Sequence, residues 1–367
     1  MRPLPTGDVT PCCVSGAELP IGNTKINTLE DIWNDAPMRG LRRNMLSGEP
    51  SVQCRKCYTQ EALNIKSMRQ WANRTFADHI TDVNMTSDDG HHSEFKMRYI
   101  DVRFSNICNF SCRICDPWLS SAWWEDAKKL RGDIDHPKLL VAGTDLLEQI
   151  IPHLKYTEEI YFAGGEPLLM SEHYSILNYL VDQNLTHIRL KYNTNLSVLT
   201  YKNIRVLDLW KHFPNVEVSA SLDGSGKHAE YMRKGTRWDD ILDNWNLIKS
   251  VAPHVVMKVH CTISVMNALH VIDFYNHWVP SMIDPANFEL NILTDPEHYG
   301  VDILPTPFKE IVRNKAGDNP AFDEMIAYMM TDDKSSKFGE FIELTSKIDS
   351  IRDESFIEIF PEFKDYI

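Results

Sequence analysis

The sequence predicts an α/β fold in which a parallel sheet closes into a full or partial barrel, between a small cysteine-rich module and a helical tail. Between residues 97 and 293, short runs rich in β-branched and aromatic residues alternate with segments of helical periodicity. Such alternation is typical of parallel strands connected by helices. A polar stretch near residue 90 separates this region from a beginning that has cysteines of its own.

Six runs are predicted as strands and five intervening segments as helices. The strands are expected over residues 97–104, 159–162, 187–192, 216–222, 255–263 and 288–293. The helices are expected over residues 120–131, 146–153, 173–183, 238–250 and 271–278. In a barrel of this kind, reactive groups gather at the carboxyl ends of the strands.

The flanking regions are predicted as separate parts of the chain. Residues 1–80 form the N-terminal module, with one helix over residues 28–46 whose start is capped by Thr28. The polar residues 81–93 have no apolar periodicity and are predicted as a linker. The barrel is therefore expected over residues 95–300.

The last residues, 301–367, alternate charged and apolar side chains with helical spacing. They are predicted to form a helical C-terminal extension that packs on the outside of the barrel or covers one end.

Composition limits the class of protein. Seven of the eight cysteines fall into two tight groups, which is typical of metal ligation in a reducing compartment and not of a secreted disulfide framework. No apolar run approaches the ~18 residues that a membrane span needs, and the first residues lack the apolar core of a signal peptide, so a cytoplasmic protein is expected. The formal net charge of -14 disfavours a long nucleic-acid footprint.

Three thiols lie within eight residues directly after the first predicted strand, in the run Cys108-Asn-Phe-Ser-Cys112-Arg-Ile-Cys115. Thiolates select iron-sulfur clusters, zinc or copper(I). A cube of four irons held by three protein thiolates keeps one iron free to bind another molecule. The alternative is a structural zinc site with a fourth ligand from elsewhere, but such sites usually use paired C-x2-C knuckles and close at four ligands. The odd number of cysteines favours an open cluster.

A second motif, Gly164-Gly165-Glu166-Pro167, follows the second predicted strand. Two residues without side-chain bulk allow the backbone to come close to a ligand, and proline fixes φ. Taken alone, the motif is an ordinary β-α turn. Because both motifs follow strands of one parallel sheet, they are expected at the same edge.

The C-x3-C-x2-C spacing, followed about fifty residues later by Gly-Gly-Glu-Pro, resembles the radical S-adenosylmethionine (radical SAM) superfamily. The resemblance implies a partial (β/α)6 TIM-like barrel. It also implies that Cys108, Cys112 and Cys115 hold a [4Fe-4S] cluster whose fourth iron is chelated by S-adenosylmethionine. Reductive cleavage of that cofactor would give a 5'-deoxyadenosyl radical, which abstracts hydrogen from a substrate. The family often has an aromatic residue before the third cysteine, whereas this chain has Ile114, which can still shield the cluster.

The resemblance also implies the residues that bind the cofactor. The motif that begins at Gly164 would hold the methionyl ammonium, with a carboxylate near the positive charge. Further matches end the third and fourth strands, where Ser221 and Asp223 would contact the cofactor's ribose, and an arginine beyond them would pair with the cofactor's carboxylate. Each match alone is more often an ordinary turn or a surface charge, and their order along the chain supports them. The complete set is Gly164, Gly165, Glu166, Pro167, Asn195, Ser221, Asp223 and Arg233.

The second cysteine group consists of Cys12, Cys13, Cys54 and Cys57. A structural zinc knuckle is one interpretation of it. With Ile21-Gly22-Asn23 and Leu29-Glu30-Asp31-Ile32-Trp33-Asn34, the group resembles the SPASM/twitch domain, which implies an auxiliary [4Fe-4S] cluster. In most relatives this domain follows the barrel, whereas here it precedes it. Side chains of adjacent residues in an extended chain diverge, so either Cys12 or Cys13 can be a spectator.

Relatives with this accessory domain commonly modify peptides or proteins, which makes a peptide or protein the leading substrate class by resemblance. Two alternatives stay open: a radical SAM enzyme for a small molecule such as a sugar or nucleoside, and a catalytically silent metal-binding interaction protein. A reductant such as flavodoxin or ferredoxin is the expected partner. The lone Cys261 is expected to be a small buried residue, with a hydrogen-atom donor facing the barrel lumen as the alternative.

Overall fold

The computed structural model describes residues 1–62, 66–143 and 145–367. Contacts between residues divide the chain into two compact units, and each is described in turn. The first unit comprises Met1–Ser105, Leu140–Gly164 and Met170–Leu190. The second comprises Asn106–Leu139, Gly165–Leu169 and Lys191–Ile367. The domain boundaries expected from the sequence stay a prediction.

Six strands form a parallel sheet with the strand order β13-β12-β10-β7-β6-β4. The strands are β4 (Tyr99–Val102), β6 (Glu159–Phe162), β7 (Arg189–Thr194), β10 (Val216–Ser221), β12 (Val256–Ile263) and β13 (Phe288–Ile292). All six predicted strands are present, although the first is shorter than expected. The α/β class and the parallel sheet are confirmed, and the sheet is consistent with a partial barrel.

The N-terminal part of the first unit begins with a small antiparallel sheet of β1 (Arg2–Pro3), β2 (Asp8–Thr10) and β3 (Gly22–Asn23). The single helix expected over residues 28–46 is wrong, because the structure has two helices, α1 (Leu29–Trp33) and α2 (Ala36–Ser47). Thr28 caps α1 through a capping box, as predicted. Asp35 caps α2 and a proline lies in its first turn, so the chain stops and restarts there.

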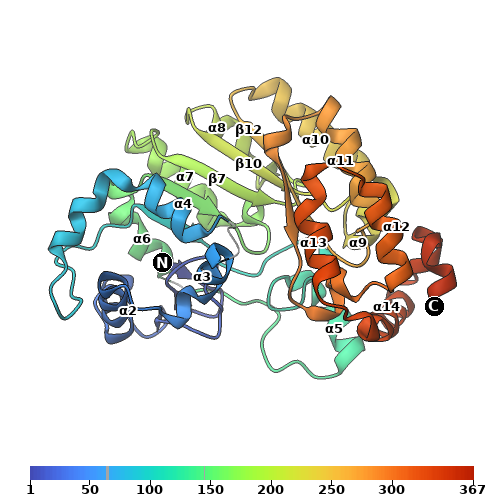
Figure 1. The fold of residues 1–367 in the computed structure, drawn as a ribbon. Helices are drawn as coiled ribbons and strands as arrows, with labels where there is room; N and C mark the ends of the chain where they lie inside the picture. Colours follow the sequence, from blue (N-terminus) through green and yellow to red (C-terminus); the bar gives the residue numbers. More distant parts are fainter. Residues whose placement is uncertain (63–65, 144) are drawn as a thin grey trace. The chain divides into compact units, whose positions relative to one another are not determined.

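The rest of the first unit is mainly helical (Figure 1). The residues expected as a linker begin inside a 3-10 helix, Ala77–Met85, so that expectation is wrong for its first residues. The remaining helices are the 3-10 turn Val52–Cys54, α3 (Arg55–Ala62), α4 (Met68–Thr75), α6 (Leu146–Ile150), the 3-10 segment Ile151–Tyr156 and α7 (Ser171–Asp182).

In the second unit, β10 and β12 lie side by side, and β12 pairs with β13 (Figure 1). One face of β12 is apolar and buried, with Val259, Cys261 and Ile263 completely shielded from solvent. Phe288 of β13 pairs with Val259 and packs its ring against the rings of Phe274 and Tyr275. The buried face is therefore the face that α11 (His270–Ser281) covers, and Cys261 lies on it.

Among the described residues of the second unit, two further pairs of short strands accompany the parallel sheet: β5 (Ser111–Cys112) with β11 (Arg233–Lys234), and β8 (Thr200–Tyr201) with β9 (Ile204–Arg205). The helices that precede the C-terminal tail include the 3-10 turn Ser121–Trp123, α5 (Trp124–Arg131), α8 (Val206–Trp210), α9 (Gly226–Met232) and α10 (Trp238–Val251).

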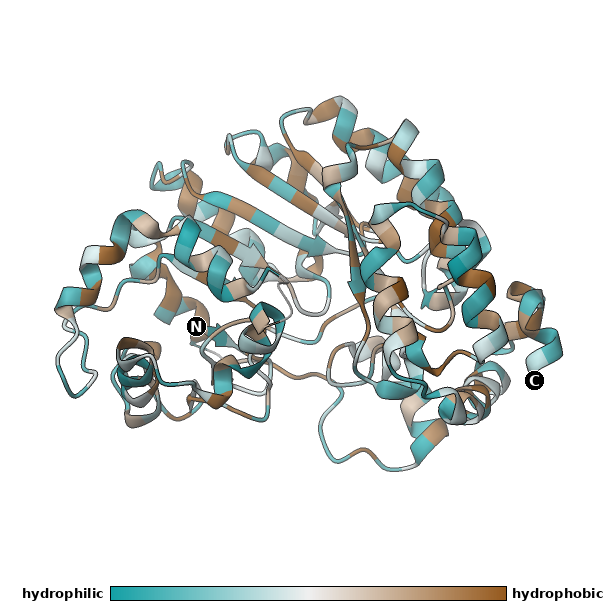
Figure 2. Ribbon diagram, in the orientation of Figure 1, coloured by the Kyte–Doolittle hydropathy of each residue, from teal (hydrophilic) through white to brown (hydrophobic). Residues whose placement is uncertain are grey.

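The C-terminal residues form the expected helical tail, with α12 (Thr306–Ala316), α13 (Asp323–Thr331), α14 (Phe338–Arg352) and α15 (Phe356–Ile359). Figure 2 shows hydrophilic and hydrophobic bands alternating along these helices, which is typical of helices that bury one face. None of the helices among the described residues is long and apolar enough to cross a membrane.

The turn after β12 is held by a buried asparagine, and its removal is expected to destabilise the second unit. Asn267 Nδ2 donates to the backbone oxygens of Asp223 (2.8 Å) and Thr262 (2.9 Å), and its Oδ1 accepts from Ser264 N (2.7 Å). Asn267→Ala leaves these buried groups unpaired, so we expect the free energy of unfolding to fall by about 3 kcal/mol. Urea unfolding followed by tryptophan fluorescence measures it. The exposed Asn291→Ala is the control, and equal stability of the two variants would contradict the prediction.

Candidate functional site

The cysteine loop is fixed by its backbone. Strand β5 pairs antiparallel with β11, which places Arg233 opposite Cys112. The amide of Cys115 donates to the carbonyl of Cys112 (3.0 Å), and the indole Nε1 of Trp123 donates to the same carbonyl (2.6 Å). A backbone hydrogen bond and the indole of Trp123 therefore both hold the turn from Cys112 to Cys115.

Nitrogen donors lie close to two of the three sulfur atoms. The amide of Phe110 donates to Cys108 Sγ (3.4 Å), and Asn195 Nδ2 lies 4.0 Å from the same sulfur. A terminal nitrogen of Arg233 lies 3.8 Å from Cys112 Sγ. Hydrogen bonds to the sulfurs are one of the means by which proteins tune iron-sulfur clusters. The loop therefore offers three thiols and their donors, which fits a cluster with three protein ligands.

The thiols differ in how easily they ionise. Burial raises the pKa of Cys108 to about 12. The thiol of Cys115 donates to the sulfur of Cys112, and this bond together with the charge of Arg233 lowers the pKa of Cys112 to about 7, in spite of burial. The same bond raises the pKa of Cys115. The S–H···S bond thus favours the loss of one proton from the pair of Cys112 and Cys115, and bound metal would supply the positive charge that further ionisation needs.

The glycines of the second motif are required by a close approach of backbone to backbone. Gly164 and Gly165 have φ angles of 78° and 48°. A Cβ on Gly165 would lie only 2.2 Å from the carbonyl oxygen of Ile107. The amide of Glu166 donates to that same oxygen at 2.7 Å. The motif is therefore tied to the residue that precedes Cys108.

The carboxylate of Glu166 connects this motif to the end of β7. Its Oε1 accepts from Thr194 Oγ1 (2.8 Å) and from the amide of Leu168 (3.1 Å), and its Oε2 accepts from the amide of Asn195 (2.7 Å). Burial raises the pKa of Glu166 to about 7 in spite of these three donors. The side chain positions two strand-end loops, and its contact with a cofactor stays a prediction.

Two residues expected to bind different parts of the cofactor contact each other. Arg233 lies 2.7 Å through Nε from Asp223 Oδ2, and a terminal nitrogen donates to Oδ1 at 2.9 Å. Burial opposes the charge of Arg233, but Asp223 and the nearby Cys112 hold the pKa of Arg233 above its ordinary value. Ser221 ends β10 opposite His260 of β12. Contacts therefore connect the cysteine loop, the Glu166 motif and the ends of β7 and β10.

Other residues of the site carried no signal of their own in the sequence. Asn109 Oδ1 accepts from Asn195 Nδ2 (2.9 Å), and Asn109 Nδ2 donates to Ser197 Oγ (2.9 Å). A Cβ on Gly235 would lie 2.7 Å from the ring of Phe110. Both contacts join parts of the chain that are far apart in sequence, so only the fold could bring them to the cysteine loop.

The second cysteine group lies within the first unit. Arg2 fixes the turn of Cys12 and Cys13, since it donates to the carbonyl oxygens of Cys13 (2.7 Å) and Ser15 (2.8 Å). Burial and the thiols of Cys12 and Cys57 raise the pKa of Cys54.

The neighbouring Cys13 has a different environment, because burial and Asp101 raise its pKa to about 11. Cys12 is therefore close enough to Cys54 to raise its pKa, whereas Cys13 lies near Asp101. Among the described residues, no three His, Cys, Asp or Glu side chains are arranged to hold a single metal ion.

Comparisons with known protein families identify two regions of the chain. Residues 102–271 match the radical SAM superfamily, and residues 4–58 match the SPASM iron-sulfur cluster-binding domain. No curated protein matches the chain.

Solved structures that are similar to the chain have low identity. They include native anSMEcpe with bound AdoMet (18% identity, TM-score 0.41, covering 56% of each chain). The same protein with AdoMet and the Cp18Cys peptide has 16% identity and a TM-score of 0.39, over 56% of this chain and 55% of that one. Streptococcus suis SuiB bound to S-adenosylmethionine has 15% identity and a TM-score of 0.38, over 67% of this chain and 49% of that one. The chain thus covers about half the length of each of these structures.

Iron counting tests the proposed ligands of the cysteine loop. Anaerobically reconstituted protein should hold roughly eight irons, on the assumption of two four-iron cubes, and replacement of Cys108, Cys112 and Cys115 by alanine should leave about four. Iron and sulfide analysis measures this, and Cys261→Ala, at a buried cysteine outside both groups, is the matched control. Zinc in the wild-type loop, or no loss of iron in the triple variant, would contradict the assignment.

The two adjacent cysteines of the first unit are expected to differ. Cys12→Ala should lose the second set of about four irons, because Cys12 is close enough to Cys54 to raise its pKa, whereas Cys13→Ala should retain them because Cys13 lies near Asp101. The same iron and sulfide analysis compares the two variants. Equal loss in both would show that the two thiols are equivalent.

Proposed function

We propose that this chain, a radical SAM enzyme with a SPASM domain at its N-terminal end, uses S-adenosylmethionine to remove a hydrogen atom from a peptide or protein. The radical SAM domain binds a [4Fe-4S] cluster and S-adenosylmethionine, and the SPASM domain binds an iron-sulfur cluster. When bound, the first cluster supplies the electron that cleaves the cofactor. The observation that carries the proposal is the continuous set of contacts from Cys108 through Asn195 to Glu166, and from Cys112 through Arg233 to Asp223.

Cys108, Cys112 and Cys115 would hold the cluster, and the protein around them would keep water away. Cys112 is buried, as are Phe110 within the loop and Trp123, which donates to the loop backbone. Exclusion of water protects a reactive radical from side reactions. The burial of these residues and the hydrogen bond from Trp123 support this exclusion of water from the cluster.

The cofactor would lie against the strand ends. Asp223 already accepts hydrogen bonds from Arg233 and from the amide of Thr262 (2.8 Å). We therefore assign the ribose contact to Ser221, and we assign to Asp223 the orientation of Arg233. Arg233 would then remain between the cluster loop and the cofactor's carboxylate, with its planar fork held on one edge by Asp223.

The substrate would lie on the polar face of β10, β12 and β13, opposite the face that α11 covers. Lys258 Nζ lies 3.2 Å from Glu217 and 3.3 Å from Glu289, and His260 Nε2 lies 3.0 Å from Glu289. His260 is the residue opposite Ser221, so this charged surface begins beside the proposed ribose site.

Hydrogen abstraction requires the substrate carbon to lie next to the cofactor's radical carbon. A surface of ion pairs and hydrogen-bonding groups suits the polar backbone and side chains of a peptide. The similarity of the N-terminal module to the SPASM domain supports the same class of substrate.

Formation of 5'-deoxyadenosine tests the proposed reaction. Reconstituted protein incubated without oxygen, with S-adenosylmethionine and dithionite, should form this product, which chromatography and mass spectrometry detect. The Cys108/Cys112/Cys115 triple alanine variant should form none, because its barrel cluster is absent. If both clusters are present and no product forms, the catalytically silent interaction protein is the correct interpretation.

Binding of S-adenosylmethionine should depend on the ionisation of Glu166. Its pKa of about 7 in the free protein means that the carboxyl is largely protonated at pH 6 and largely ionised at pH 8. If the ionised form accepts from the cofactor's amino group, affinity should rise about tenfold from pH 6 to pH 8. Anaerobic calorimetry measures this dependence. Glu166→Gln should lack this component, so an equal pH dependence in the variant would remove Glu166 from the binding site.

A further inference from the structure

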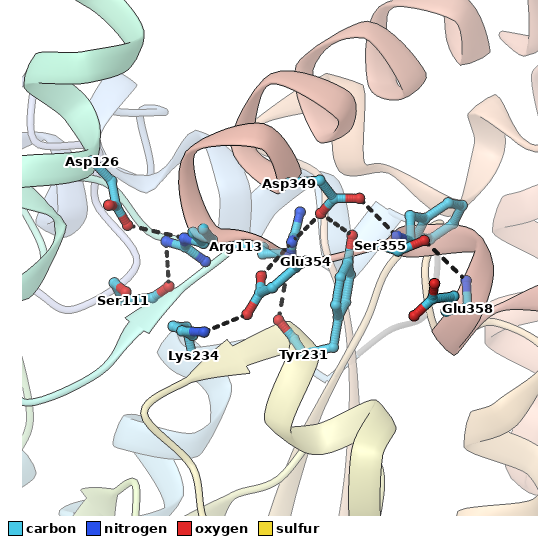
Figure 3. A network of polar contacts seen from close by, with 11 residues as sticks. Ser111, Arg113, Asp126, Tyr231, Lys234, Asp349, Glu354, Ser355 and Glu358 are labelled. Carbon is cyan, nitrogen blue, oxygen red and sulfur yellow. Dashed lines mark hydrogen bonds and ion pairs between the residues drawn. The ribbon is translucent and has the colours of Figure 1, made fainter.

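An arginine lies between two of the proposed cluster ligands, and residues from the end of the chain hold it. Arg113 directly follows Cys112, with Ile114 between it and Cys115, and its side chain is fully buried. A terminal nitrogen of its guanidinium contacts Asp349 of α14 and lies 2.6 Å from Oε2 of Glu354 (Figure 3). The C-terminal extension thus reaches directly into the cysteine loop of the second unit.

The partners of Arg113 are themselves fixed. The guanidinium carbon lies 3.6 Å from the centre of the Tyr231 ring, and Nε donates to the Tyr231 carbonyl (3.3 Å). The hydroxyl of Tyr231 donates to Asp349 Oδ1 (2.7 Å), and the amide of Phe356 donates to Asp349 Oδ2 (2.6 Å). Glu354 also pairs with Lys234 at 2.7 Å. Both carboxylates are therefore held in position by contacts other than those with Arg113.

A second arginine, in the last turn of α14, holds the residue before Cys112. Arg352 donates through a terminal nitrogen to the carbonyl of Ser111 (2.8 Å) and through Nε to Asp126 (2.9 Å). Its guanidinium carbon lies 4.6 Å from the centre of the Trp123 ring. The last turn of α14 and the residues after it therefore hold both neighbours of Cys112, at positions 111 and 113.

Arg113 directly follows the end of β5 and begins the turn to Cys115. Its amide donates to the carbonyl of Met232 (2.8 Å), and its guanidinium is held by Asp349 and Glu354. The backbone and the side chain of Arg113 are therefore both fixed directly beside Cys112, whose sulfur lies 3.8 Å from a terminal nitrogen of Arg233. Burying an arginine with two carboxylates is costly compared with apolar packing, so stability alone gives little reason for it.

We propose that Asp349 and Glu354 are positioning residues for the barrel cluster. They hold Arg113 so that Cys112 and Cys115 keep a ligating geometry, and their charges contribute to the reduction potential of the cluster. The C-terminal extension is then part of the cluster site, not only a cover for the fold. This inference rests on the proposed function, since it takes Cys108, Cys112 and Cys115 as cluster ligands.

The test uses Asp349→Asn and Glu354→Gln, which keep size but remove one charge each. Outer partners that orient metal ligands are worth about tenfold to a hundredfold in metal affinity, so iron should leave the barrel cluster correspondingly faster in the presence of a chelator. The reduction potential, followed by electron paramagnetic resonance, should become more positive because a negative charge near the cluster is lost. Arg113→Lys keeps the charge without the fork and should show intermediate iron loss.

Asp302→Asn is the matched control. Asp302 is a buried carboxylate of the same C-terminal extension, and its ion-pair partner is Lys334 at 2.9 Å, which is not part of the cysteine loop. The control should lose stability but keep the wild-type rate of iron loss and the wild-type potential. If Asp349→Asn and Glu354→Gln behave like this control, the proposal is overturned.

Two further measurements keep the test decisive. If Asp349→Asn does not fold, Tyr231→Phe removes only one hydrogen bond to Asp349 and should show a smaller change of iron loss in the same direction, and no change would overturn the proposal. Failure of the proposed function is a separate result, because it would appear as absence of 5'-deoxyadenosine in wild-type protein that holds iron normally. The iron-loss and potential measurements do not depend on that product.

Discussion

The pairing of β5 with β11 is the constraint on which the rest of the site depends. It places Arg233 beside Cys112 through main-chain hydrogen bonds, so the sulfur atoms are not needed to hold the loop. Further contacts connect this pair of strands to the ends of β10 and β7. Arg233 reaches Asp223 at the end of β10, and the loop beyond Cys108 reaches the end of β7 through Asn109 and Asn195. A loop held by its backbone can keep its thiols in place before any metal binds, which lowers the ordering cost that metal binding would otherwise include.

The fold was largely predictable because its signals are local. Each strand of the parallel sheet is a short run that contains β-branched or aromatic residues, and the helices between the strands have their own periodicity. Errors occurred where local chemistry overrode the pattern. The helix expected over residues 28–46 is interrupted because Asp35 caps a new helix. Residues 81–93 lack apolar periodicity, yet they begin within the 3-10 helix Ala77–Met85. Both features concern only a few residues, which is where reasoning from periodicity is weakest.

The site was predictable only in part, for a physical reason. Cysteine and glycine motifs are contiguous in sequence, so they can be identified without the fold. The contacts that determine what those residues do are not contiguous. The sequence assigned Asp223 and Arg233 to different parts of a cofactor, whereas in the structure they form an ion pair. It gave no sign that Asp349, 236 positions beyond Arg113, would contact it. Pairing between distant charged residues depends on how helices pack on the sheet, and no pattern in one sequence encodes it.

The balance of charge around the loop explains why metal binding and deprotonation have to occur together. Three arginines approach the cysteine loop, and each already has a carboxylate partner: Asp223 for Arg233, Asp126 for Arg352, and the pair Asp349 and Glu354 for Arg113. Little positive charge is therefore left to stabilise three thiolates. Burial raises the pKa of Cys108, and the bond to Cys112 raises the pKa of Cys115, so these two thiols keep their protons in the protein alone. Their protons have to leave as iron arrives, because only the metal supplies the missing charge. The paired arginines then orient and shield the loop, while the iron itself provides the driving force for ionisation.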